Sequence, residues 1–135
     1  MKKILCVDND LRFLHLYFDK LSEEGYEVIL AKDDGEAVSK FDKLKPDIVV
    51  MDVRMPLIEA TKVLNVMLGK NGQIPVIVNT TYPQYRENFV TCGAEACLIK
   101  AFDLSELKQK VRELLGKRQG AKAPRDYRRH LGLSE

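Results

Sequence analysis

Four short apolar runs in this chain each end on a polar side chain that could take part in metal or phosphoryl chemistry. The run ends are Asp8, Asp52, Thr80 and Lys100. Carboxylates are preferred ligands of Mg²⁺, which also binds phosphate oxygens and water. A hydroxyl can bond a phosphoryl oxygen, and a lysine ammonium contacts phosphate as a point charge. If the four run ends lie close together, the sequence predicts a site for a divalent cation and a phosphoryl group.

Alternating strand and helix patterns predict how these run ends are positioned. The expected strands are 3–7, 27–31, 47–52, 75–79 and 96–99, and the expected helices are 11–24, 35–44, 57–68, 84–92 and 103–116. Repeated βα units favour an α/β fold, with a parallel sheet covered by helices on both faces. In the flavodoxin-like, doubly wound strand order 2-1-3-4-5, the first and third strands are neighbours at the switch point. This order would place Asp8 beside Asp52.

Length and charge indicate one domain followed by a basic segment. A chain of 135 residues can bury a single core without disulfides. Residues 117–135 carry six basic and two acidic side chains, whereas the net charge of the whole chain is only +2. We therefore expect a mildly acidic domain at 1–117 and a basic tail or truncated interdomain linker at 118–135.

Cysteine usage and hydropathy bear on the cellular compartment and on partners. Cys6, Cys92 and Cys97 have no metal-ligand spacing, and we expect small, reduced, buried side chains and a cytoplasmic location. No apolar run approaches the ~20 residues that cross a membrane. The tail is too short to hold a DNA-reading module, so we expect neither a membrane partner nor sequence-specific nucleic-acid binding.

The ordered motifs resemble those of response-regulator receiver domains of two-component signalling, in the CheY-like superfamily. The resemblance runs from Lys2 to about Leu115. Its motifs are the first strand ending at Asp8, the stretch Pro46–Pro56 around Asp52, the strand ending at Thr80, and Gly93–Leu104 around Lys100.

The resemblance implies a phosphorylation switch and not a dedicated enzyme. Asp52 would accept phosphate from a histidine kinase or phosphotransfer protein. Asp8, Asn9, Asp52 and the backbone carbonyl of Arg54 would hold Mg²⁺, and Thr80 and Lys100 would sense the phosphoryl group. The output would go to a downstream protein effector or a lost output domain. The resemblance places the output surface on the fourth helix, fifth strand and fifth helix, with homodimerisation as one use of it.

Several positions depart from the pattern of that family. Asn9 stands where the family has a second acid, and the lost charge predicts weaker Mg²⁺ binding. Asp10 lies one residue further on and could compensate in part. Ala101 follows Lys100 where a proline is usual, and Cys97 stands in place of an aromatic switch residue.

Two alternatives follow from the same residues. The departures also suit a degenerate receiver that docks proteins without being phosphorylated. The Asp8-Asn9-Asp10 sequence is an Asp-x-Asp after a strand, as in haloacid-dehalogenase-type phosphatases, with Asp8 as nucleophile and Asp10 as general acid. Arg12 stands where that family has Thr or Val.

Overall fold

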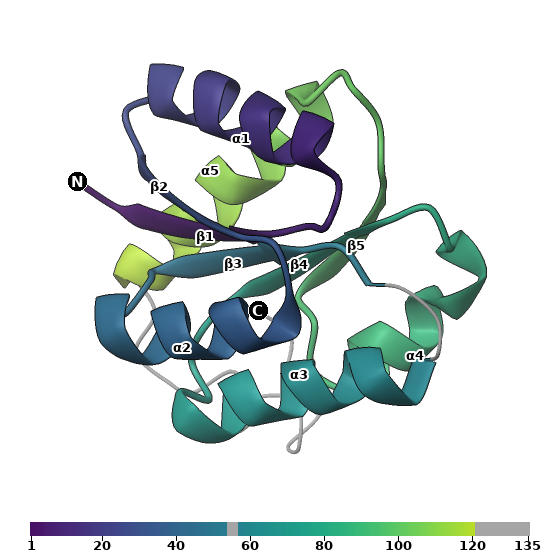
Figure 1. The fold of residues 1–135 in the computed structure, drawn as a ribbon. Helices are drawn as coiled ribbons and strands as arrows, with labels where there is room; N and C mark the ends of the chain where they lie inside the picture. Colours follow the sequence, from purple (N-terminus) through teal and green to yellow (C-terminus); the bar gives the residue numbers. More distant parts are fainter. Residues whose placement is uncertain (54–56, 121–135) are drawn as a thin grey trace.

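The computed structural model describes residues 1–53 and 57–120, which form five strands, five α-helices and one 3₁₀ turn (Figure 1). The elements are β1 (Lys3–Val7), α1 (Leu11–Glu23), β2 (Glu27–Ala31), α2 (Asp34–Leu44), β3 (Ile48–Met51), α3 (Leu57–Lys70), β4 (Val76–Thr80), η1 (Pro83–Tyr85), α4 (Arg86–Thr91), β5 (Ala96–Ile99) and α5 (Ser105–Gly120). No helix in the described part of the chain has the length and hydropathy of a membrane span.

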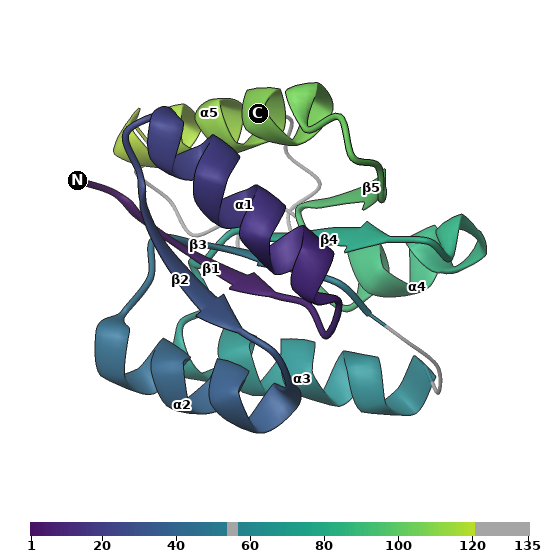
Figure 2. The same cartoon turned by 45° about the horizontal axis from the view of Figure 1, so that its top comes forward.

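The sheet is parallel throughout and has the strand order β2-β1-β3-β4-β5. Helices α1 and α5 cover one face, and α2, α3 and α4 cover the other (Figures 1 and 2). The predicted α/β class, the flavodoxin-like order and the adjacency of the first and third strands are confirmed.

Each strand contributes side chains to both faces of the sheet, which explains why its sequence is apolar without alternation. In β1, Ile4 and Cys6 pack with α1 and α5, whereas Leu5 and Val7 pack with the α2 and α3 side. Cys6 has no exposed surface, and its burial raises the pKa of the thiol. The expectation of a buried cysteine is confirmed for Cys6 and Cys97, whereas Cys92 is partly exposed.

The predicted helix bounds differ from the observed ones by one or two residues for the first three helices, and the last two helices differ further. The fourth begins as η1 and becomes α4 only at Arg86, because Pro83 opens a tight turn there. The fifth was predicted to end at Gly116, but α5 continues to Gly120. A glycine ends a helix when it adopts the left-handed conformation, and among the described glycines only Gly25 and Gly93 do so. The predicted domain limit at residue 117 therefore falls within α5, and 121–135 lie outside the described residues.

Burial of α4 against the sheet depends on Phe89, which is 1% exposed. We expect Phe89→Ala to lower the free energy of unfolding by about 3–5 kcal/mol, because a large cavity remains in the core. Phe18→Ala is the matched control, since this phenylalanine of α1 is 50% exposed. Urea unfolding followed by circular dichroism measures both, and equal losses would contradict the packing described.

Candidate functional site

Backbone hydrogen bonds extend the sheet by one residue at its carboxyl edge and fix the residues that carry the chemistry. The Asp8 N–H donates to the carbonyl of Ala31 at 3.0 Å, and the Asp52 N–H donates to the carbonyl of Val7 at 2.9 Å. Between β4 and β5, the Lys100 N–H donates to the Thr80 carbonyl at 2.8 Å. The strand ends are thereby held in register with their neighbours.

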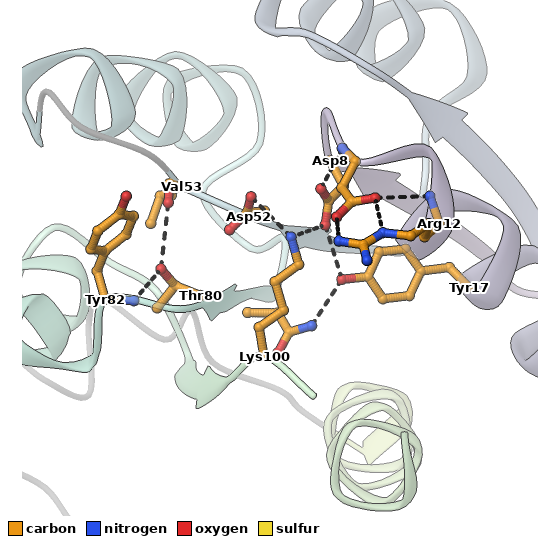
Figure 3. A network of polar contacts seen from close by, with 10 residues as sticks. Asp8, Arg12, Tyr17, Asp52, Val53, Thr80, Tyr82 and Lys100 are labelled. Atoms are coloured by element: carbon orange, nitrogen blue, oxygen red, sulfur yellow. Dashed lines mark hydrogen bonds and ion pairs between the residues drawn. The ribbon is translucent and has the colours of Figure 1, made fainter. Parts of the chain in front are cut away.

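Lys100 joins the two aspartates (Figure 3). Its Nζ lies 2.8 Å from Oδ2 of Asp8 and 3.2 Å from Oδ2 of Asp52. The three side chains are almost fully buried, with exposed fractions of 3% for Lys100, 0% for Asp8 and 3% for Asp52. With both carboxylates ionised, the cluster has one more negative than positive charge, so it favours a further cation.

Asp8 has additional partners that position its carboxylate. Its Oδ1 accepts from the N–H of Asp10 at 2.9 Å, and its Oδ2 accepts from the Tyr17 hydroxyl at 3.4 Å. Tyr17 in turn accepts from Nδ2 of Asn79 at 2.8 Å. The side chains of Asp8, Tyr17 and Asn79 are buried. Burial is the main cause that raises the pKa of Tyr17, so the tyrosine hydroxyl keeps its proton.

Tyr17 and Asn79 were not predicted as site residues. Tyr17 occupies the apolar stripe of α1, where a tyrosine resembles any core side chain. Asn79 could have been recognised more easily than Tyr17, because an amide inside a fully buried strand requires a hydrogen-bond partner.

Thr80 is buried beside the aspartate cluster, but its hydroxyl contacts the backbone (Figure 3). Oγ1 donates to the carbonyl of Val53 at 3.4 Å and accepts from the N–H of Tyr82 at 3.0 Å. The hydroxyl therefore links the residue that follows Asp52 to the segment that leads into η1.

The residues after Asp8 differ in how they are placed. Asn9 is exposed. Asp10 caps α1 by accepting from the Arg12 N–H at 2.9 Å, and the Arg12 guanidinium binds the same carboxylate at 2.8 and 3.1 Å. The hydrogen bond from the Arg12 side chain is the main cause that lowers the pKa of Asp10 to about 2. Asp10 is thus engaged by the helix terminus and by Arg12.

The donor set suits Mg²⁺ better than a metal that requires a full protein cage. Within residues 1–53 and 57–120 no group of three or more His, Cys, Asp or Glu side chains could hold an ion. Mg²⁺ needs only one or two carboxylates and completes its octahedron with water and phosphate oxygens. Asp8 and Asp52, which share one ammonium, fit that requirement. Arg54, predicted to ligate through its carbonyl, lies outside the described residues.

Comparisons with known proteins relate the chain to one family. The model of the response regulator receiver domain family matches residues 4–112. The transcriptional regulatory protein TrcR of Mycobacterium tuberculosis is 29% identical over 132 residues, which cover 96% of this chain and 51% of TrcR. The chain spans about half the length, or less, of the curated relatives it matches.

Two solved structures extend the likeness to the fold. Response regulator protein TrrA of Thermotoga maritima, in complex with Mg²⁺ and BeF, is 35% identical with a TM-score of 0.77 and covers 84% of this chain and 99% of its own. TrrA bound to the histidine kinase ThkA gives 36% identity and a TM-score of 0.75, over 85% of this chain and 99% of TrrA.

The Asp10–Arg12 contact predicts a measurable titration. We expect the Asp10 carboxyl to titrate near pH 2, and Arg12→Ala to move its pKa up toward the usual value of about 3.9. Because the folded-state pKa is depressed, the contact stabilises the fold fully above pH ~4 and loses this contribution as pH falls through about 2. Carboxyl ¹³C NMR measures the titration, and an unchanged Asp10 pKa in Arg12→Ala would contradict the assignment.

Proposed function

Because the chain belongs to the response regulator receiver domain family, we propose that Asp52 accepts a phosphoryl group from a histidine kinase or phosphotransfer protein of a two-component phosphorelay. The observation that carries this proposal is the placement of Asp52 at the end of β3, beside Asp8 and 3.2 Å from the Lys100 ammonium. The reported complex of TrrA with a histidine kinase supports the choice of donor.

In the proposed reaction an Asp52 oxygen attacks the phosphorus of a phosphohistidine. The N–P bond breaks as the O–P bond forms, and the imidazole leaves, so that an acyl phosphate remains on Asp52. Lys100 supplies positive charge beside the transferred group, where its ammonium already contacts Asp52.

Mg²⁺ would be held by Asp8 and Asp52, together with the amide of Asn9 and the backbone carbonyl of Arg54. When bound, it shields the negative charge of the phosphoryl oxygens. The complex of TrrA with Mg²⁺ and BeF supports this assignment. Asn9 contributes no charge, which is why we expect weaker binding than a three-carboxylate site would give.

The proposed switch begins with charge. Phosphorylation adds about −1.5 to −2 charges at pH 7 to a cluster that already has one excess negative charge. The Thr80 hydroxyl can bond a phosphoryl oxygen only by giving up its contact with the Val53 carbonyl. Since Thr80 also accepts from the Tyr82 N–H, its movement would draw the segment before η1 toward Asp52.

We propose that this movement is read on the surface formed by α4, β5 and α5. Ile99 of β5 is 64% exposed there, whereas Cys97 is buried and has no ring to reorient. The reader would be a downstream protein effector, a second copy of this chain, or an output domain where the chain forms part of a longer protein.

The alternatives differ in their support. A phosphate-independent docking module is supported by the ion pairs of Lys100 with Asp8 and Asp52, which can serve as structural contacts inside the fold. A haloacid-dehalogenase-type phosphatase would need Asp10 protonated as a general acid. Arg12 opposes this because it holds the pKa of Asp10 at about 2.

Incubation with acetyl phosphate and Mg²⁺ tests the proposal. We expect intact mass spectrometry to show one added phosphoryl group on the native chain and none on Asp52→Asn, because the amide is a poor nucleophile. Asp19→Asn is the matched control, since Asp19 is exposed on α1, and it should be phosphorylated at the native rate. If neither the native chain nor the control gains mass at high Mg²⁺, the docking module becomes the better description.

A further inference from the structure

The Lys100 ammonium has a third partner, on helix α1. Its Nζ lies 4.3 Å from the centroid of the Phe13 ring. Phe13 is 6% exposed, so the contact is largely removed from water. An ammonium over an aromatic face is attracted by the ring quadrupole, most strongly where solvent is excluded. The ammonium is therefore bounded by Asp8, Asp52 and this ring.

The Phe13 ring is itself braced by neighbouring side chains. Phe102, between β5 and α5, stacks on it with centroids 4.8 Å apart and an interplanar angle of 16°. Tyr17, one helical turn further along α1, packs against it at 5.9 Å. Residues four apart share one face of a helix, so α1 presents one side chain to Lys100 and another to Asp8.

The position of the ammonium depends on several contacts together, because the lysine side chain is long. Four rotatable bonds separate the ammonium from the backbone. Ala101, which follows Lys100, is exposed and offers only a methyl group. The two carboxylates attract the ammonium by charge, and the Phe13 ring bounds it from the side of α1.

We propose that Phe13 is a positioning residue, which holds the Lys100 ammonium between Asp8 and Asp52 through the face of its ring. The consequence for reactivity rests on the proposed phosphorylation of Asp52. With the ammonium confined, its contact with an incoming phosphoryl group is set before the group arrives, and no lysine rotamer has to be ordered during the reaction. Phe102 stacks on Phe13, so the position of the ring also depends on the segment between β5 and α5.

The test uses three variants of the full chain. Phe13→Leu removes the ring but keeps an apolar side chain, and Phe13→Tyr keeps the ring face. Phe41→Leu is the matched control, because Phe41 is also buried, at 5% exposed, but packs on the opposite face of the sheet. Urea unfolding and circular dichroism establish that each variant is folded.

The first readout is the position of the lysine and does not depend on phosphorylation. In ¹³C-lysine-labelled protein, the ring should shield the ε-methylene protons of Lys100, with the signal assigned by its absence in Lys100→Arg. We expect a downfield shift of this signal in Phe13→Leu, and near-native positions in Phe13→Tyr and Phe41→Leu.

The second readout is the rate of phosphorylation by acetyl phosphate at saturating Mg²⁺. We expect Phe13→Leu to react about tenfold more slowly than Phe41→Leu, a loss of rate equivalent to one desolvated cation–π contact. Phe13→Tyr keeps the ring and should recover most of the rate. The proposal is overturned if the Lys100 signal is unmoved in Phe13→Leu, or if Phe13→Leu and Phe41→Leu react equally fast. Should the native chain accept no phosphate, the proposed function fails while the Lys100 signal still decides the role of Phe13.

Discussion

The structure depends on one interaction, the contact of a buried lysine ammonium with two buried carboxylates. Asp8 and Asp52 end neighbouring strands of a parallel sheet, so their charges are brought together by the strand order itself. Two desolvated negative charges on adjacent strands would oppose folding unless a cation lay between them. Lys100 supplies that cation from the position directly after β5, a strand that lies two places from β3 in the sheet.

The surrounding residues fix the positions of the Asp8 carboxylate and the Lys100 ammonium. Tyr17 and Asn79 give Asp8 a hydrogen-bonded chain that reaches β4, the strand that ends at Thr80. Phe13 bounds the ammonium from α1. The carboxylates that bind the ammonium are also the ones proposed to hold Mg²⁺, so the lysine and the metal ion would share Asp8 and Asp52. Under the proposed phosphorylation, a new charge at Asp52 would act by redistributing these existing contacts.

The sequence was sufficient for the fold class, because buried parallel strands have continuous apolar runs and βα alternation predicts a parallel sheet. The meeting of Asp8, Asp52 and Lys100 followed once the flavodoxin-like strand order was assumed. The sequence was insufficient wherever one residue type has two structural uses. Asp10 could have entered the pocket, but the terminus of α1 and Arg12 engage it. Phe13 and Tyr17 look like ordinary core residues of an amphipathic helix. Gly116 looks like a helix end, yet α5 continues past it because nothing there adopts the left-handed conformation.

The most direct test of the shared ligands is the affinity for Mg²⁺ of the native chain and of Lys100→Met, measured by isothermal titration calorimetry at constant ionic strength. The Lys100 ammonium lies 2.8 Å from Asp8 and 3.2 Å from Asp52 and competes with Mg²⁺ for both carboxylates. Its removal should lower the dissociation constant for Mg²⁺ by roughly tenfold. An affinity that is unchanged or weaker in a folded Lys100→Met variant would contradict the account, since the ammonium and the metal would then not share Asp8 and Asp52.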